Sequence, residues 1–305
     1  MTQTLTFYCQ TITPMFLHGA DGKTPELRAP SIKGGLRFWW RALHGHLDLS
    51  QLKEEEALIF GASNQGIGRS SFSIRVSNSF PHQSDIITIA PLPHRSPPSF
   101  KAKAIKIGYQ FRIGFTIEAH KHPHFNLQTL ENLFILLSIL GGIGKRARRG
   151  FGSFMITHIQ RNKNKVAPFN VPDPLTKIQE IYQTITPHSL SLHKGLLQGK
   201  SVPSSVSFPY VKRIAVGKTI HSNLLEVIGR QTHDFLKNAS SAWDYKDAMG
   251  HAESGRLASP VYVSALQSDR GLVPVITTLH AALKGRRSIS KNAQQIQQDF
   301  QDKLL

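Results

Sequence analysis

The 305-residue chain carries 37 lysine and arginine residues against 19 aspartate and glutamate residues, which gives a formal net charge of +18 and an isoelectric point near 10.2. One cysteine excludes an internal disulfide, and no stretch approaches the roughly 20 apolar residues that a membrane-spanning helix needs. Residues 1–160 hold 18 of the basic and 9 of the acidic residues, so the charge is evenly spread and a neutral enzyme with a basic tail is excluded. This charge predicts a nucleic-acid-binding protein, which we expect to be cytoplasmic and without a secretory leader.

The first half of the sequence predicts the element order β-α-β-β-α-β, with an extra short helix and loops after the first helix. The expected elements in chain order are a strand at 4–12, helices at 32–47 and 53–60, strands at 71–76, 85–89 and 104–119, a helix at 127–140 and a strand at 151–159. Ser31 is the expected N-cap of the first helix. This order is that of a ferredoxin-like (RRM-like) domain. We place it at 1–160, with a glycine-rich loop at 141–152.

The second half predicts a fainter version of the same order. A polar segment interrupted by prolines, residues 161–173, marks the domain boundary. The expected elements that follow are a strand at 207–216, a helix at 222–238, strands at 260–266 and 272–278 and a helix at 289–302. The last strand is missing, so this domain, at 174–305, is incomplete or permuted. The predicted fold class is α+β, with two ferredoxin-like βαββαβ domains in tandem.

The first predicted helix carries one group of candidate RNA-binding residues. Lys33, Arg37 and Arg41 recur every four residues and form a basic stripe on one side of the helix. Two glycines follow Lys33 and would let phosphates approach the first turn. Trp39 lies beside the stripe and could stack on a base, and Ser31 stands at its start. The alternative is an amphipathic helix with a solvated cationic face and a tryptophan used for packing.

The glycine-rich loop at 141–152 carries the second group. Five glycines and four cations in twelve residues predict a mobile, exposed and strongly positive connection between a helix and a strand. The candidate RNA-binding residues here are Gly144, Lys145, Arg146, Arg148 and Arg149. The alternative is a plain helix–strand connection.

Catalytic and metal-binding signals are weak. No Gly-Lys pair has the spacing of a P-loop, and the alternating histidines within 120–124 have no further metal ligand nearby in sequence. His44 and His46 are two apart on a predicted helix, so we expect them to face different sides without a partner. Asp21 lies in a turn, where aspartate usually serves turn chemistry. We expect no metal, no cofactor and no catalysis, with Asp21, His44 and His46 as outside candidates.

Several segments resemble the RAMP superfamily of CRISPR proteins and, within it, the family of first subunits of the type III-B (Cmr) effector complex. The resembling segments are TPMFLHGAD at 13–21, PELRAPSIKG at 25–34, LRFWWRAL at 36–43, IFGAS at 59–63, GRS at 68–70, GKRARRGFGS at 144–153, GRLASP at 255–260 and PVITTL at 274–279. They are scattered over most of the chain, and the N-terminal segments are the most specific.

The resemblance implies an RNA-binding subunit that caps the end of the complex holding the 3′ part of the guide RNA and aids the capture of target RNA in antiviral defence. The implied partners are single-stranded guide or target RNA and neighbouring RAMP subunits, with no membrane. Target cleavage in such complexes is assigned to another subunit, through an acid in a loop like that of Asp21. The alternatives are a RAMP-type, metal-independent endoribonuclease that processes guide precursors with His44 or His46, and a basic scaffold that binds protein.

Overall fold

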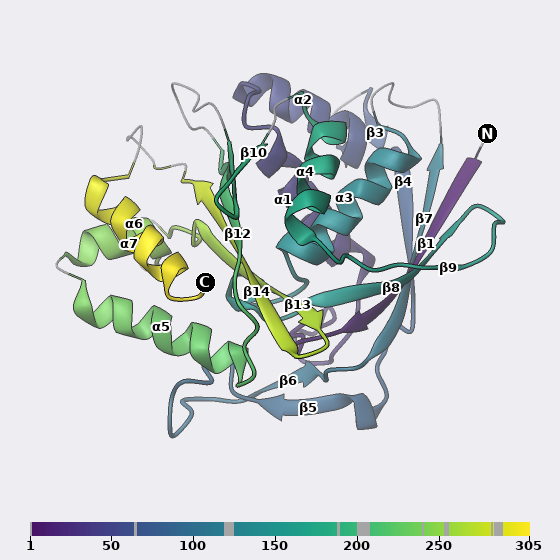
Figure 1. The fold of residues 1–305 in the computed structure, drawn as a ribbon. Coiled ribbons are helices and arrows are strands. Elements are labelled where there is room, and N and C mark those ends of the chain that lie inside the picture. Colours follow the sequence, from purple (N-terminus) through teal and green to yellow (C-terminus); the bar gives the residue numbers. More distant parts are fainter. Residues whose placement is uncertain are drawn as a thin grey trace.

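The structure, a computed structural model, describes residues 2–63, 66–118, 125–187, 190–199, 208–239, 241–252, 256–281, 283 and 289–305. The main strands of these residues form two five-stranded antiparallel sheets (Figure 1). Helices lie between the two sheets and on the outer side of the second one. The chain is therefore an α+β protein, as predicted. Within the described ranges, no helix is long and apolar enough to cross a membrane.

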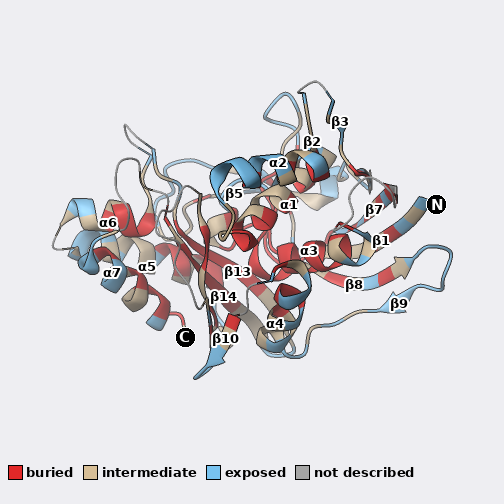
Figure 2. Ribbon diagram, turned by 90° about the horizontal axis from the view of Figure 1, so that it is seen from above, coloured by how far each residue is buried: buried red, intermediate tan, exposed pale blue. Residues whose placement is uncertain are grey.

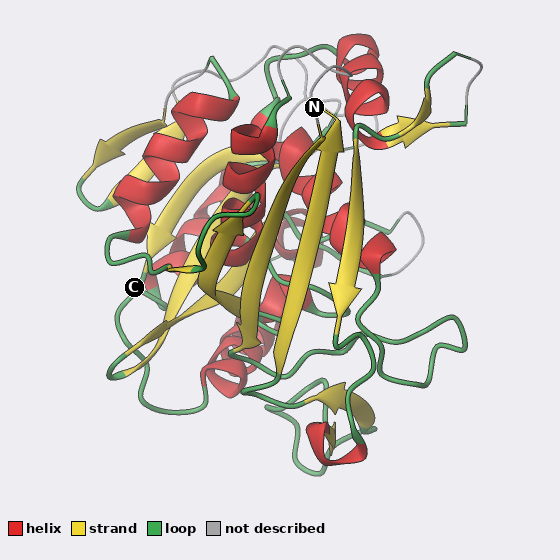
Figure 3. Cartoon of the chain, turned by 90° about the vertical axis from the view of Figure 1, so that its right-hand side faces the viewer, coloured by secondary structure: helices red, strands yellow, loops and turns green. Residues whose placement is uncertain are grey.

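The first sheet contains strands from the N-terminal half. They are β1 (Thr2–Thr11), β4 (Phe72–Ser77), β7 (Gln110–Glu118), β8 (Phe154–Arg161) and β9 (Ala167–Pro168). Their order is β4-β7-β1-β8-β9, so β1 lies in the centre. Leu5, Phe7 and Cys9 alternate with less buried residues along β1, because successive side chains of a strand point to opposite faces. Helices α1 (Ala29–Leu43) and α3 (Leu127–Leu140) cover the buried face, and the other face is turned outward (Figure 3).

The second sheet contains strands from the C-terminal half. They are β10 (Leu190–His193), β11 (Leu196–Gly199), β12 (Tyr210–Val216), β13 (Val261–Ser268) and β14 (Gly271–His280), in the order β10-β11-β12-β14-β13. The helices on its outer side are α5 (Leu224–Asn238), α6 (Ala242–Met249) and α7 (Lys291–Asp302). Its inner side faces α1, α3 and α4 (Pro174–Ile185), so the middle helices pack against both sheets (Figure 1).

The hydrophobic core continues from the first sheet through the middle helices to the second sheet. Phe7 of β1, Trp39 of α1, Ile178 of α4 and Tyr262 of β13 all belong to one cluster of buried residues. The buried residues accordingly gather along the middle of the molecule (Figure 2). A separate cluster fills the space between the second sheet and its outer helices. The two halves of the chain are thus joined by apolar packing.

The long strand predicted at 104–119 is wrong, because the chain turns within it. Strand β6 (Ala102–Ile105) ends before Gly108, whose φ of 84° is a left-handed conformation that glycine adopts without strain. Strand β6 pairs with β5 (Ile86–Ile89), which follows the short helix η1 (Gln83–Asp85), in a separate two-stranded unit. The alternation of apolar residues continues through the turn, although the strand does not. Ile107, which lies in the turn, is 55% exposed and does not contribute to a buried strand face.

The first helix also differs from the prediction at both ends. Ser31 is not its N-cap, because α1 begins after Arg28 and has no side-chain cap. Pro30 lies in its first turn, where the fixed φ of proline suits a helix and its missing N–H costs nothing. The helix ends at Leu43, four residues earlier than predicted. The next helix, α2 (Leu49–Phe60), begins four residues earlier than predicted, since Asp48 forms a capping box there.

Several elements were not predicted. They are α4, α6, the β10–β11 hairpin, the short strands β2 (Gly61–Ala62), β3 (Gly68–Arg69) and β9, and the short helices η1 and η2 (Ala147–Arg149). The hairpin matters most for the topology. Strand β11 precedes β12 in the chain and pairs with its free edge, opposite β14. A strand therefore occupies the place that the sequence pattern left empty.

Candidate nucleic-acid interface

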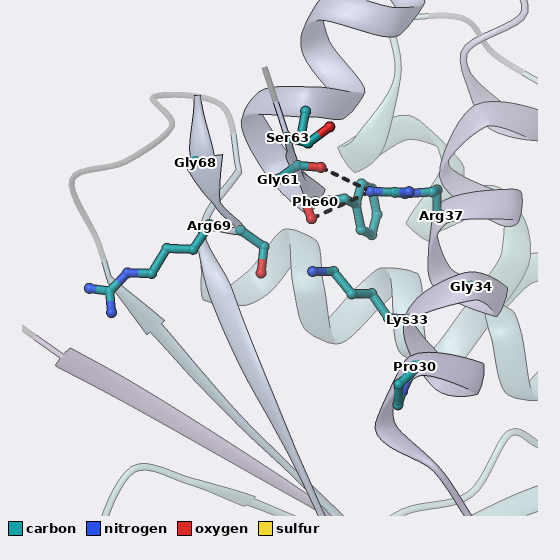
Figure 4. A pocket seen from close by; sticks show the side chains of 11 residues that line it. Pro30, Lys33, Gly34, Arg37, Phe60, Gly61, Ser63, Gly68 and Arg69 are labelled. Atoms are coloured by element: carbon teal, nitrogen blue, oxygen red, sulfur yellow. Dashed lines mark hydrogen bonds between the residues drawn. The ribbon is translucent and has the colours of Figure 1, made fainter. Parts of the chain in front are cut away.

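A groove of about 560 Å³ lies between the first half of α1 and the β2–β3 hairpin (Figure 4). Its lining residues are Pro30, Lys33, Gly34, Arg37, Phe60, Gly61, Ala62, Ser63, Gly68, Arg69 and Ser70. The side chains of Lys33 and Arg37 reach into it from the helix, and the side chain of Arg69 extends outward from the opposite wall. A Cβ added at Gly34 would meet no atom within 4 Å, so the helix surface is open there.

Lys33 is the cation that faces the groove most directly. Its amine lies 6.0 Å from the centroid of the Phe72 ring, and no ion pair involves it in the part of the chain that the structure describes. Partial burial and then the neighbouring Arg37 lower the pKa of Lys33. A bound anion would oppose both effects, since it stabilises the charged amine. The position therefore favours binding of a negatively charged group.

Arg37 and Arg41 are instead held by the protein itself. Both guanidinium groups pair with Glu56 of α2, a carboxylate that is 8% exposed; Arg37 Nε lies 2.9 Å from its Oε1, and Arg41 binds it with two nitrogens. Arg37 also donates to the carbonyl oxygen of Gly61 at 3.1 Å, as the dashed lines of Figure 4 show. The stripe exists as predicted, but one carboxylate neutralises part of it and fixes its geometry.

The groove continues over the edge strand β4. An adjoining hollow of about 400 Å³ shares Pro30, Lys33, Arg69 and Ser70 with it and extends to Thr116 of β7. Reasoning from the sequence missed Arg69 and Ser70 as site residues, because both lie in a short hairpin with no helical or strand periodicity. The signal that could have found them is the family-like segment 68–70.

Trp39 cannot stack on a base in this structure, so that prediction is wrong. Its side chain is 1% exposed and packs 5.3 Å from the Phe38 ring and 5.2 Å from the Tyr262 ring. Gly141 lies against the indole, and a Cβ there would come within 2.4 Å of its Nε1. The tryptophan is a packing residue between α1 and the second sheet.

The glycine-rich loop is folded inward over part of its length, which contradicts the exposed position that we expected for two of its arginines. The guanidinium of Arg148 lies 5.1 Å from the Phe38 ring and 5.2 Å from the Tyr262 ring and donates to the carbonyl of Ser259. Arg149 donates to the carbonyl oxygens of Val261 at 3.0 Å and Met249 at 3.2 Å. Burial lowers the pKa of Arg149 to about 10, so it stays charged at neutral pH.

The glycines of this loop serve close packing against protein backbone. A Cβ at Gly152 would lie 2.0 Å from the carbonyl oxygen of Ile143, and one at Gly144 would lie 2.5 Å from that of Phe16. The loop is therefore ordered by its contacts, and the expected mobility is wrong. Gly144, Lys145 and Arg146 at its tip remain exposed.

His44 and His46 do come together, contrary to the prediction that they face different sides. The helix ends at Leu43, and the two rings lie 5.6 Å apart in a pocket that Glu54 and Glu55 also line. His44 stacks on Trp40 and hydrogen-bonds its carbonyl oxygen at 2.7 Å, and burial lowers the pKa of His44 to about 4. A general base works best with a pKa near the working pH, so His44 is poorly suited to that role.

Asp21 serves its own turn. Its carboxylate accepts hydrogen bonds from the backbone N–H groups of Lys23 and Thr24, both at 2.9 Å, and from the Thr24 hydroxyl. The Thr24 hydroxyl and these N–H groups lower the pKa of Asp21 to about 2. Within the described ranges, no group of three or more histidine, cysteine, aspartate or glutamate residues could hold a metal ion. The histidines of 120–124 lie outside the described residues.

Comparison with known families decides what kind of protein carries this groove. Residues 8–155 match the RAMP superfamily. This part of the chain is therefore similar to RAMP-superfamily proteins. Both walls of the groove and all the residues of α1 lie inside the matched range.

Two proteins of Pyrococcus furiosus are similar to the chain in sequence. The CRISPR system Cmr subunit Cmr1-2 is 28% identical over 176 residues, which cover 49% of this chain and 93% of that protein. The subunit Cmr1-1 is 28% identical over 245 residues, which cover 69% of this chain and 64% of that protein. The chain thus resembles the first subunit of the Cmr complex.

Solved structures share the fold. The crystal structure of apo Cmr1 from Pyrococcus furiosus aligns over 97% of this chain and 96% of its own, with a TM-score of 0.57 and 18% identity. A chain of the type III-B Cmr-beta complex bound to cognate target RNA aligns over the full length of both chains, with a TM-score of 0.64 and 12% identity. At such low identity, these alignments show a common fold that includes the second sheet.

Proposed function

We propose that this chain is an RNA-binding subunit of a type III-B CRISPR RNA-guided effector (Cmr) complex, acting in the cytoplasm in antiviral defence. The observation that carries the proposal is the groove with Lys33 at its centre, within the part of the chain that matches the RAMP superfamily. The net charge of +18 and the fold shared with a chain of the Cmr-beta complex support it.

The groove is suited to the backbone of single-stranded RNA, from the guide or the target strand. Lys33 offers a positive charge at the centre of the groove, and Arg69 offers a further cation at its outer rim. The open surface at Gly34 allows a chain of phosphates to lie close to the helix. Contacts of this kind position RNA and do not read its sequence.

We further propose two ferredoxin-like domains in tandem, at 1–160 and 174–305. The first-sheet order β4-β7-β1-β8, with α1 and α3 as the crossing helices, supports the first domain. In the second, β12, β13 and β14 take the places of the first three strands, and β11 takes that of the fourth. Because β11 comes before β12 in the chain, the second domain is permuted.

In the complex, this subunit would cap the end that holds the 3′ part of the guide RNA, touch a neighbouring RAMP subunit and aid the capture of target RNA. We propose that it does not catalyse cleavage. The low pKa of His44 and the engagement of Asp21 in its own turn support this, since neither group is poised to take a proton at neutral pH.

Substitution of Lys33 tests the proposal. Lys33→Ala should lower the affinity for single-stranded RNA by roughly tenfold, because a charged contact to phosphate is lost. It should also reduce the slope of log affinity against log salt by about 0.7, the value for one phosphate of a single strand. Lys53→Ala, at an exposed lysine of α2 outside the groove, is the matched control and should leave both quantities unchanged. Equal behaviour of the two variants in fluorescence anisotropy would show that the groove does not bind RNA.

A further inference from the structure

A second group of basic side chains lies where three separate segments meet. His94 and Arg95 come from the loop between β5 and β6, Arg146 from the tip of the glycine-rich loop, and His233 from α5. We call these four residues the His94 cluster. The rings of His94 and His233 lie 5.4 Å apart and are tilted by 31°. None of the four lines the groove beside α1.

The position of His94 is fixed by a close fit to α5. A Cβ at Gly229, one turn before His233, would come within 2.5 Å of the Nδ1 atom of His94, so only glycine leaves room for the ring. This Nδ1 is buried and has no hydrogen-bond partner among the described residues. The nitrogen that can reach a ligand is therefore Nε2.

Arg146 is held in an unusual conformation. Its φ of 62° and ψ of 19° are left-handed, which costs a residue with a side chain roughly 1–2 kcal/mol. The residue is nevertheless exposed, so the conformation does not serve to bury its side chain. Strain of this kind is often kept at functional sites.

The charges that face His94 are mostly positive. After burial, His233, Arg95 and Arg146 lower the pKa of His94, and only the carboxylate of Asp234 raises it. A further ion pair on α5, between Arg230 and Glu226, is neutral as a unit. Three basic groups around a half-buried imidazole repel one another, and an anion among them would turn this repulsion into attraction.

We propose that the His94 cluster is a second phosphate-binding site, and that it takes a phosphate of an RNA backbone. The identity of the ligand as RNA rests on the proposed function, whereas the preference for phosphate rests on the cluster itself. Arginine forks and imidazole N–H groups match phosphate oxygens. The cluster also gives the exposed tip of the glycine-rich loop a role, although the rest of that loop is packed inward.

The site has a signature that the groove lacks. Phosphate favours the protonated imidazole, so binding raises the pKa of His94 and the complex takes up protons. Affinity at this site therefore increases as the pH falls from about 8 to about 6. No histidine is among the described residues that line the groove, so its contribution to RNA binding is constant over this range.

The test uses the full chain and histidine Cε1–H NMR signals, titrated alone, with inorganic phosphate and with a short oligouridylate, whose bases do not titrate in this range. The pKa of His94 should rise with both ligands, and at a fixed pH the signal of the exposed His221 should not move when either ligand is added. An unchanged pKa of His94 would overturn the site, even if Lys33→Ala shows that the groove binds RNA. A rise with inorganic phosphate alone would overturn RNA as the ligand.

Variants give an independent readout. Wild-type protein should bind oligouridylate at least about threefold more tightly near pH 6 than near pH 8 at constant ionic strength. The double variant His94→Gln/His233→Gln should lose this ratio, whereas Lys33→Ala and the control His221→Gln should keep it. Arg146→Asn, which tolerates the left-handed conformation, should weaken binding near pH 6 several-fold. A ratio that survives in the double variant would overturn the proposal.

Discussion

The groove beside α1 and the glycine-rich loop at 141–152 are built from the same kinds of residues, glycines next to closely spaced cations. In the groove, Gly34 faces open space and Lys33 lines the hollow. In the loop, Gly152 lies against a backbone carbonyl and Arg149 donates to carbonyls of β13 and α6. Composition is therefore a poor guide to exposure, because the carbonyl groups that draw Arg149 inward lie 100 and 112 residues away in the chain.

The glycines give the sharpest test of this difference. Gly152→Ala should destabilise the fold by about 4 kcal/mol, because the methyl group would collide with the Ile143 carbonyl and φ is 69°. Thermal unfolding measures the effect. Gly195→Ala, at a positive φ in open space, is the control and should cost only the backbone strain. Equal losses for the two variants would mean that the loop is not closely packed.

The second largest loss of stability is expected for a buried arginine of the loop. Arg149→Ala should cost about 3 kcal/mol, because carbonyl oxygens of Val261 and Met249 lose their donor inside the protein. The melting temperature should fall by roughly 6 °C, and Lys145→Ala at the exposed tip should leave it unchanged. RNA affinity of the folded Arg149 variant should equal that of wild type. If Arg149→Ala lowers the affinity for RNA but leaves the melting temperature unchanged, Arg149 binds RNA and is not a packing residue.

The two ends of α1 differ as well. The surface near its N-terminal end is exposed at Gly34, whereas at its C-terminal end the buried His44 packs on Trp40. The folded-state pKa of His44, about 4, is lower than the ordinary value near 6.5, so the unfolded state binds the proton more readily between these values. Stability is full above about pH 6.5 and is lost as the pH falls toward 4. Near pH 5, the protonation of His44 in the unfolded state should lower the free energy of unfolding by about 2 kcal/mol relative to neutral pH. Chemical denaturation of wild type and His44→Gln should give curves that converge on acidification, and parallel curves would contradict the assignment.

The smallest effect on stability is expected in the groove. Gly34→Ala should stabilise α1 by about 1 kcal/mol, the difference in helix propensity, because the methyl group meets no atom. The same methyl group narrows the groove, so the affinity for single-stranded RNA should fall. Gly35→Ala, whose methyl group would contact Leu137 inside the protein, should leave RNA affinity unchanged. A gain in stability with unchanged affinity would place the RNA elsewhere.

The local pattern of the sequence was sufficient for most elements. Apolar alternation predicted β1, and the apolar run at 127–140 predicted α3 with the observed bounds, because these elements bury the faces that their periodicity marks. The basic stripe of α1 was predicted from the four-residue spacing of Lys33, Arg37 and Arg41, which places them on one side of a helix. Elements without a clear apolar period, such as the β10–β11 hairpin, were missed, and the turn at Gly108 was hidden by alternation that continued across it.

The sequence by itself determined the net charge, the resemblance to the RAMP superfamily and the helix that carries Lys33. Only the tertiary structure decided which cations face solvent, because that depends on partners distant in the chain. Glu56 of α2 holds Arg37 and Arg41, the aromatic rings of Phe38 and Tyr262 enclose Arg148, and α5 brings His233 beside His94. A charge is stabilised by whatever acceptor or ring the fold places within a few ångströms, and no local pattern of residues records that neighbour.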